Sequence, residues 1–312
     1  MSTATPALDL PGGLPDHSAP PPGSAPPESP GAPGEPQPRT VIRPTRGWAG
    51  LKLGEVWAFR DLLYTLGARN VKLVYKQTLL GVAWVLLQPL IGAGLFAFVF
   101  GVLAEMPSGE LPYFVFSFAG MLGWTLFSAT LTASSMVMVS NAHLVSKIYF
   151  PRLILPLSAA SQPLVNFLVS LILMAALAVM YSIVPSWRLL LLPVWSALLL
   201  MLAVGIGFWL SSIMVTYRDL RYIVPVGVQF LLYASPVGYS VAAVSEKVPA
   251  SVERFYMLNP LAGLLEGFRW SLLNEGTLTP GWTVYSVVVA PVVLVVGACL
   301  FRRAEKRFAD VI

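Results

Sequence analysis

The chain has 312 residues, of which 56% are hydrophobic and only 11% are charged. An average soluble domain carries roughly 25% charged residues, so a soluble fold of this length could not hide so much apolar surface. The composition therefore excludes an ordinary soluble domain and indicates an integral membrane protein.

The first 48 residues are rich in Pro, Gly, Ser and Ala and show no hydrophobic period. Such a segment cannot bury enough apolar surface to offset the entropy of its chain. We expect a disordered cytoplasmic tail there. A secretory signal is not expected, because no charged start is followed by an apolar core.

Residues 49–78 are predicted to form an amphipathic helix that lies flat in the membrane interface. At the helical period, the polar residues of this segment fall within an arc of about 80°, and they are Asp61, Thr65, Arg69, Lys72 and Lys76. The opposite side is apolar and carries Val56, Phe59, Leu62, Leu63, Leu66, Leu73 and Val74. The basic stripe could face lipid phosphates, as a simple anchor, or a cytoplasmic partner subunit.

Six stretches without Asp, Glu, Lys or Arg follow in the transmembrane domain, residues 79–301. Each exceeds the ~20 residues that a helix needs to cross the hydrocarbon layer. A lone strand would leave backbone groups unpaired in lipid, so we expect an all-α integral membrane fold. The six predicted transmembrane helices are 81–103, 111–135, 153–180, 189–215, 222–243 and 281–301.

Two connections are expected to be more than simple loops. In the segment 136–152, Pro151 and the following Pro156 disfavour one uninterrupted helix, so we expect a short surface helix before the chain re-enters the membrane. In the external segment 247–275, the apolar run 255–265 is too short to span and contains Pro260 and Gly263. We therefore expect short re-entrant helices before the last span.

The orientation follows from the distribution of basic residues among the short loops. With both termini in the cytoplasm, the cytoplasmic segments hold 16 of the 20 Lys and Arg residues, and the external segments hold four. The segment 302–312 is then a cytoplasmic C-terminus. The net charge of +5 is explained by this bias, so no nucleic-acid partner is expected.

Several chemistries have no basis in the sequence. None of the six lysines follows a glycine, so there is no phosphate-binding loop, and the energy source must be another polypeptide or an ion gradient. Cys299 is the only cysteine, and His143 has only His17, in the tail, as a companion, so no metal site is predicted. The predicted spans contain no acidic or histidine residue, which argues against an ion-coupled carrier.

Six segments carry a resemblance to a known family. They are VKLVYKQTLLGVAWVLLQPL (71–90), KIYFPRLILPL (147–157), YRDLRY (217–222), SPVGYS (235–240), NPLAGLLEGFR (259–269) and FRRAEKRFADVI (301–312). In order and spacing they resemble the membrane subunit of type-2 ABC exporters, and within those the permeases for O-antigen, capsular polysaccharide and teichoic acid. One departure is Val74, where the family pattern has Arg before the Tyr-Lys pair.

The resemblance implies a homodimer with a channel at its interface, paired with two copies of an ABC ATP-binding subunit. That partner would hold ATP and Mg, and this chain would bind no cofactor and catalyse no reaction. The substrate would be a lipid-linked polysaccharide, exported across the inner membrane. Residues implied to couple this chain to the ATPase are Arg69, Lys72, Lys76, Asn141, His143, Lys147, Tyr149 and Arg152.

Aromatic residues gather at the external side of the predicted spans. Some are expected to line the channel exit, where flat rings can meet sugars without gripping one of them. An ordinary aromatic belt or packing is the alternative interpretation. The exit candidates are Tyr113, Phe116, Tyr239, Tyr256 and Trp270.

Two other functions remain open from the sequence. One is a type-2 ABC exporter of a small hydrophobic drug or lipid, which would have a narrow, apolar dimer seam. The other is a membrane-bound enzyme of glycan assembly, which would need clustered carboxylates at one membrane face. The external candidates for such a cluster are Glu246, Glu253, Glu266 and Glu275.

Overall fold

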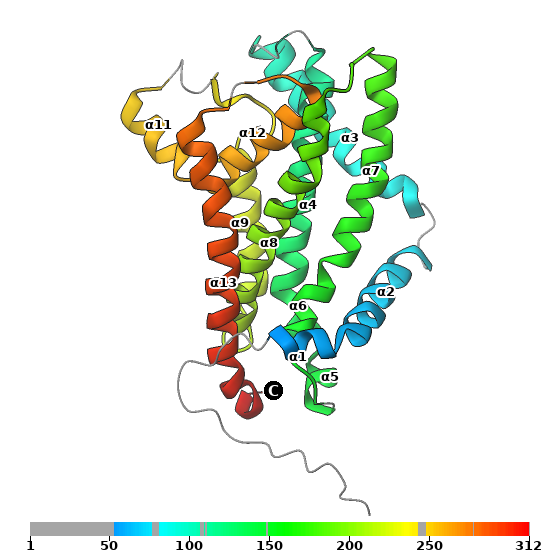
Figure 1. The fold of residues 1–312 in the computed structure, drawn as a ribbon, viewed down its shortest axis with the longest axis vertical. Helices are drawn as coiled ribbons and strands as arrows, with labels where there is room; N and C mark the ends of the chain where they lie inside the picture. The colour runs from blue at the N-terminus through cyan, green and yellow to red at the C-terminus, as the bar shows by residue number, and fades with distance from the viewer. Residues whose placement is uncertain are drawn as a thin grey trace, which may run out of the picture. The chain divides into compact units, whose positions relative to one another are not determined.

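The regular structure is helical throughout the part of the chain that the structure describes (Figure 1). The structure is a computed structural model in which residues 46–312 form one compact unit. The predicted tail, 1–48, lies outside the described residues. Those residues are 53–76, 81–106, 109, 111–147, 149–242, 248–276 and 278–311.

The expected all-α membrane class is confirmed by five helical stretches that are long and apolar enough to cross a membrane. Three of them are composite. A π-helical segment, Ala97–Leu103, continues α3 (Gly81–Phe96), and α6 (Ile154–Ala159) leads into α7 (Ser161–Met180). A 3₁₀ turn, Trp187–Leu191, precedes α8 (Leu192–Met214). The other two spans lie in α4 (Tyr113–Ser140) and α13 (Pro280–Val311).

The predicted span 222–243 is only partly helical. It corresponds to α9, Leu220–Tyr233, whose 14 residues reach about 21 Å, less than the ~30 Å of the hydrocarbon layer. The helix ends before Pro236 and Gly238, residues that do not favour a continuing helix. Six spans therefore stay a prediction.

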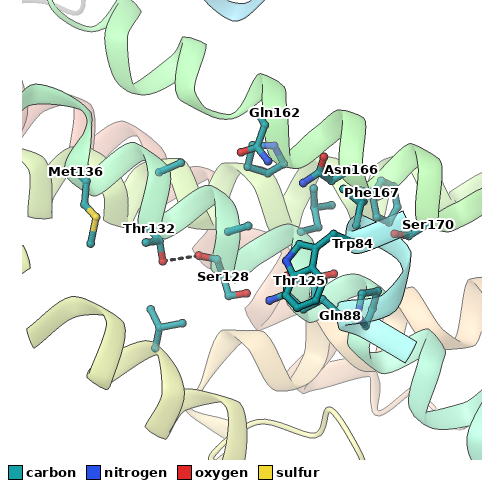
Figure 2. A pocket seen from close by; sticks show the side chains of 17 residues that line it. Trp84, Gln88, Thr125, Ser128, Thr132, Met136, Gln162, Asn166, Phe167 and Ser170 are labelled. Carbon is teal, nitrogen blue, oxygen red and sulfur yellow. Dashed lines mark hydrogen bonds between the residues drawn. The ribbon is translucent and has the colours of Figure 1, made fainter. Parts of the chain in front are cut away.

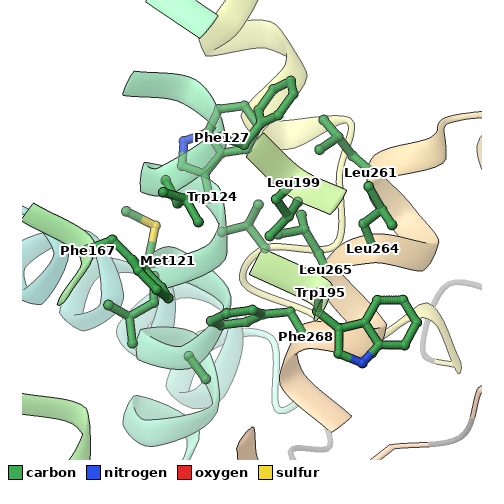
Figure 3. Close-up of a cluster of buried hydrophobic side chains, with 14 of the residues drawn as sticks. Met121, Trp124, Phe127, Phe167, Trp195, Leu199, Leu261, Leu264, Leu265 and Phe268 are labelled. Carbon is green, nitrogen blue, oxygen red and sulfur yellow. The ribbon is translucent and has the colours of Figure 1, made fainter. Parts of the chain in front are cut away.

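The core of the bundle is built around α4, which packs against α3, α7, α8 and α12. In the apolar window of α4, 78% of residues are buried, against 17% in the span that begins at Ala83. Figure 3 shows side chains of α4 meeting those of α8 and of α12, Pro260–Leu273. The labelled members include Trp124, Phe127, Trp195, Leu199, Leu265 and Phe268.

Glycine allows α8 and α13 to lie unusually close. A Cβ at Gly205 would stand 2.6 Å from the backbone nitrogen of Leu294, and one at Gly297 would collide with the Gly205 carbonyl. Small residues at helix interfaces allow such close approach, and dispersion then stabilises helix pairs in lipid. This contact fixes α13, and with it the position of the C-terminal helical turns.

The two ends of the bundle carry different short helices (Figure 1). One end carries α1 (Leu53–Ala58), α2 (Arg60–Lys76), α5 (Ala142–Lys147) and the last turns of α13. The predicted interface helix thus forms two helices with a break at Phe59. The other end carries α12 and α11 (Ala250–Met257), both inside the expected segment 247–275. Whether these helices re-enter a membrane stays a prediction.

Candidate functional site

A polar groove opens in the side of the bundle between α3, α4, α7 and α9 (Figure 2). Its volume is ≈ 760 Å³. Side chains with amides, hydroxyls and aromatic rings line it, and they come from α3, α4 and α7. The residues that give it this character are Trp84, Gln88, Thr125, Ser128, Thr132, Gln162, Asn166, Phe167 and Ser170.

The groove combines amide and hydroxyl groups with apolar side chains, and it carries no charge among its described lining residues. The hydroxyl of Thr132 donates to the Ser128 carbonyl at 2.8 Å, and that of Thr125 donates to the Leu122 carbonyl at 3.0 Å. The amides of Gln88 and Gln162 provide both donors and acceptors to the groove. Such a surface suits a neutral, hydroxyl-rich ligand better than an ion or a purely apolar molecule.

Sequence reasoning missed this groove, although a signal was present. Four side-chain amides fall inside the six predicted spans, namely Gln88, Gln162, Asn166 and Gln229. Three of them line the groove, and Gln229 does not. Polar side chains are costly in lipid and usually face a bundle interior or a cavity, so the amides marked the groove before the fold was known.

The helices that flank the groove expose apolar side chains. On α3 these include Trp84, Leu87 and Ile91, and on α9 they include Ile223 and Phe230. In a membrane such faces must be covered by lipid or by another protein surface. The groove therefore lies on an apolar face of the bundle.

The end of the bundle that carries α1, α2 and α5 is called the basic end, because Arg69, Lys72, Lys76 and Lys147 are exposed there. At this end, hydrogen bonds join α2 to the end of α4. The guanidinium of Arg69 donates to Asn141 Oδ1 at 2.8 Å, and the Asn141 amide nitrogen donates to the Val137 carbonyl at 3.0 Å. The Asn70 amide donates to the Ser158 carbonyl, 3.2 Å away. A movement of α5 is thus linked through Asn141 to α2, and Asn70 links α2 to α6.

Arg152 joins the same end to the last helix. Its guanidinium donates to the Glu305 carbonyl at 3.1 Å, which connects the segment after α5 to α13. Nearby, the Arg302 guanidinium lies 3.3 Å from the Glu55 carboxylate on α1. The N-terminal helices, the loop that contains α5 and the end of α13 therefore form one connected surface.

The other predicted coupling residues lie on the outside of this surface. His143 and Lys147 are exposed on α5, and Tyr149 follows it with 85% of its side chain exposed. Lys72 and Lys76 are exposed on α2. The structure thus places Arg69 in contact with Asn141. The five residues on the outside of this surface are accessible to a partner.

At the opposite end, a buried ion pair joins Glu266 and Arg269 of α12. Arg269 Nη2 lies 2.6 Å from Glu266 Oε2, and only 1% of the arginine is exposed. The same nitrogen donates to the Pro236 carbonyl at 3.1 Å and to the Tyr239 carbonyl at 3.3 Å. The guanidinium therefore satisfies the acceptors of the turn that follows α9.

Four of the five predicted exit aromatics gather around this arginine. Its Cζ lies 4.1 Å from the centre of the Phe116 ring, and Tyr113 donates to the Gly238 carbonyl at 2.7 Å. Burial raises the pKa of Tyr256, and its hydroxyl donates to Tyr239 Oη at 3.3 Å. Their role in an exit stays a prediction, and their contacts hold the turn after α9 in place.

Trp270 lies apart from that group. It packs edge-to-face on Trp187, with ring centres 6.1 Å apart, and Arg188 Cζ stands 4.5 Å from its ring centre. Arg188 also donates to the Asn274 carbonyl at 3.0 Å. Trp and Arg at the end of a bundle are typical of a membrane–water boundary.

These features define the membrane subunit of a transporter: apolar spanning helices, an uncharged polar groove between them and a basic surface at one end. The chain belongs to the ABC-2 type transporter family, which it matches over residues 61–273. It is 28% identical over 257 residues to the O-antigen export system permease protein RfbA of Myxococcus xanthus, covering 82% of this chain and 97% of that protein. An RfbA permease of Klebsiella pneumoniae is 26% identical over 257 residues, covering 81% of this chain and 95% of that protein.

Proposed function

We propose that this chain is the permease subunit of an ATP-driven ABC exporter that moves a polyprenyl-linked, O-antigen-like polysaccharide out of the cytoplasm. The family match and the names of the relatives support the transporter class and the substrate. The observation that carries the proposal in the structure is the uncharged, amide-lined groove at the depth of the spans. It offers hydrogen bonds to sugar hydroxyls without a fixed charge.

In this proposal two copies of the chain face each other across their polar grooves. The exposed apolar faces of α3 and α9 form the seam, and the two grooves together form the channel. The ring of Trp84, which is exposed at the groove, gives a flat surface on which sugars can slide. Glycan passes because no single contact is strong.

The energy comes from a separate ABC ATP-binding subunit, two copies of which bind ATP and Mg beneath the permease dimer. The short helix α5 and the basic face of α2 form the docking surface, and the Arg69 to Asn141 hydrogen bond links them. Closure of the ATPase pair is passed to the bundle as a movement of these helices. The basic end then faces the cytoplasm, with both termini there, and the protein lies in the cell's inner (cytoplasmic) membrane.

Export of a small hydrophobic drug or lipid is the main alternative, and export of teichoic acid is another. A purely apolar seam would favour the drug, whereas three amides and several hydroxyls in one groove favour a glycan. Glycan assembly by this chain is less well supported, since Glu266 is already paired with Arg269.

The decisive experiment removes the gene and follows the polysaccharide. We expect surface polysaccharide to disappear, lipid-linked polysaccharide to accumulate inside the cytoplasmic membrane, and the cloned gene to restore export. Unchanged surface polysaccharide together with new sensitivity to hydrophobic drugs would favour the alternative.

A further inference from the structure

A second groove lies on another face of the bundle, beneath α2. It has a volume of ≈ 730 Å³, is open on one side and is lined by α2, the α6–α7 segment, α8 and α13. Its walls are mostly aliphatic, with Leu157, Leu164, Leu200, Met201 and Leu294 among the lining residues. It shares no lining residue with the polar groove, so the two are separate features.

The serines of this groove do not make it polar. The Ser158 hydroxyl donates to the Leu155 carbonyl at 2.8 Å, and the Ser161 hydroxyl lies 2.7 Å from the Ser158 carbonyl and 3.0 Å from the Gly67 carbonyl, both of which can accept its hydrogen. Both hydroxyls are therefore engaged within the protein. Apart from Arg60, Tyr64 and Lys72 on α2, the groove offers an aliphatic surface suited to hydrocarbon.

A basic hollow continues from the apolar groove along α2. Its volume is ≈ 430 Å³, and Tyr64, Ala68 and Lys72 line both cavities. Arg69 and Lys76 complete its basic lining. Among the described residues that line either cavity, none is acidic. The aliphatic groove thus opens directly onto a hollow lined by Arg69, Lys72 and Lys76.

An aliphatic groove that continues into a basic hollow matches one kind of molecule, a membrane lipid with an anionic headgroup. A basic pocket between helices on the cytoplasmic side is a recognised form of such a site. A second copy of the chain is a poorer fit, because the polar groove and its exposed flanks lie on a different face. A soluble anion is also a poorer fit, because it leaves the aliphatic groove empty.

We propose that the groove beneath α2 binds an anionic phospholipid, with an acyl chain between α2 and the bundle and the phosphate at Lys72 and Lys76. The bound lipid holds α2 against the α6–α7 segment. Arg69, whose guanidinium donates to Asn141, adds a third positive charge to the lining of the basic hollow. This inference goes beyond the proposed function and does not depend on which molecule the transporter exports.

The test uses the full-length purified chain and native mass spectrometry, with phosphatidylglycerol and phosphatidylcholine as the probes. We expect phosphatidylglycerol to bind at lower concentration. Each lysine near the phosphate contributes about a fivefold preference, so K72Q/K76Q is expected to weaken phosphatidylglycerol binding about 25-fold. The matched control is R218Q/R221Q, which removes two exposed charges that line neither cavity. Equal binding by the two double variants would overturn the proposal.

A second pair of variants tests the groove itself. Leu164 lines it and is 37% exposed, whereas Leu168, one helical turn further along α7, is 51% exposed and lines neither cavity. Leu164→Trp should fill the groove and weaken phosphatidylglycerol binding, and Leu168→Trp should not. Equal effects of the two tryptophans would refute an acyl-chain site.

Two competitors distinguish the occupant. Glycerol phosphate, which has the headgroup charge without acyl chains, should not displace phosphatidylglycerol. If it does, the site binds a soluble anion. If a polyprenyl phosphate displaces phosphatidylglycerol at much lower concentration, or Leu164→Trp changes the oligomeric state, the occupant is a substrate lipid or a protein surface and the proposal fails.

Discussion

Arg269 and Glu266 form an ion pair inside the protein, one turn apart on α12, with 2.6 Å between Nη2 and Oε2. The arginine also donates hydrogen bonds to the Pro236 and Tyr239 carbonyls. These carbonyls lie after the end of α9 and, among the described residues, have no helical backbone hydrogen-bond partner. Backbone acceptors at membrane depth must be satisfied by the protein itself. This pair therefore makes possible a short α9 followed by a tight turn.

Replacing Arg269 by Met should destabilise the protein strongly. It leaves the Glu266 carboxylate buried without its partner, and removing one member of a buried pair costs roughly 3–5 kcal/mol. Glu266→Gln should cost less, because Arg269 keeps its carbonyl acceptors and the Phe116 ring. Thermal unfolding of the purified variants measures both. If Glu266→Gln is as damaging as Arg269→Met, the carbonyl contacts are not what Arg269 supplies.

Replacing Gln88 by Leu should lower polysaccharide export without affecting insertion. The change removes a donor and an acceptor from the polar groove while keeping a side chain of similar size. Gln229→Leu is the comparison within the proposed seam, since Gln229 is exposed on α9 but does not line the groove. Surface polysaccharide, normalised to membrane protein, is the measurement. Equal export by the two variants would show that Gln88 in the groove has no specific role in transport.

Charge reversal should have different effects at Lys147 and Arg152. Lys147 is exposed on α5, so Lys147→Glu should weaken co-purification of the ATPase without changing thermal stability. Arg152 donates to the Glu305 carbonyl, so Arg152→Glu should also lower stability, by about 1 to 3 kcal/mol. A Lys147→Glu variant that keeps the ATPase at wild-type level would remove α5 from the docking surface.

The topology can be tested by labelling single cysteines in a Cys299→Ala background. Tyr149 and Ser182 are both exposed, and they lie at the two ends of the α6–α7 span. An impermeant thiol reagent applied to intact cells should label Ser182→Cys and spare Tyr149→Cys. Labelling of Tyr149→Cys alone would reverse the orientation and exclude α5 as the cytoplasmic docking helix.

The membrane class followed from the sequence because long charge-free runs determine it almost alone. The place of α12 did not, since no local pattern says that Arg269 turns inward to meet carbonyls near residue 236. Local patterns likewise gave Lys72 and Lys76 as an exposed basic stripe, but not the aliphatic groove beside them. That groove joins residues more than 200 positions apart, such as Arg60 and Leu294. Contacts of this range depend on packing, which periodicity does not encode.

The hydrogen bond between Arg69 and Asn141 supports the last prediction, which concerns coupling. Asn141→Ala removes the acceptor of Arg69 and also the donor to the Val137 carbonyl. Asn141→Asp keeps an acceptor for Arg69 and adds a charge that attracts it. If this contact transmits movement from α5 to α2, the alanine variant should hydrolyse ATP with its partner but export little, and the aspartate variant should export normally.

A double-mutant cycle separates this coupling from a general loss of structure. Arg69→Gln and Asn141→Ala should each lower export, and the double variant should lower it little further, because both changes remove the same contact. Loss of α2 packing would instead make the two effects add. Thermal unfolding is measured alongside, and it should change little because Arg69 is exposed. Additive losses of export, at unchanged stability, would mean that Arg69 and Asn141 act independently and that α2 receives the movement by another route.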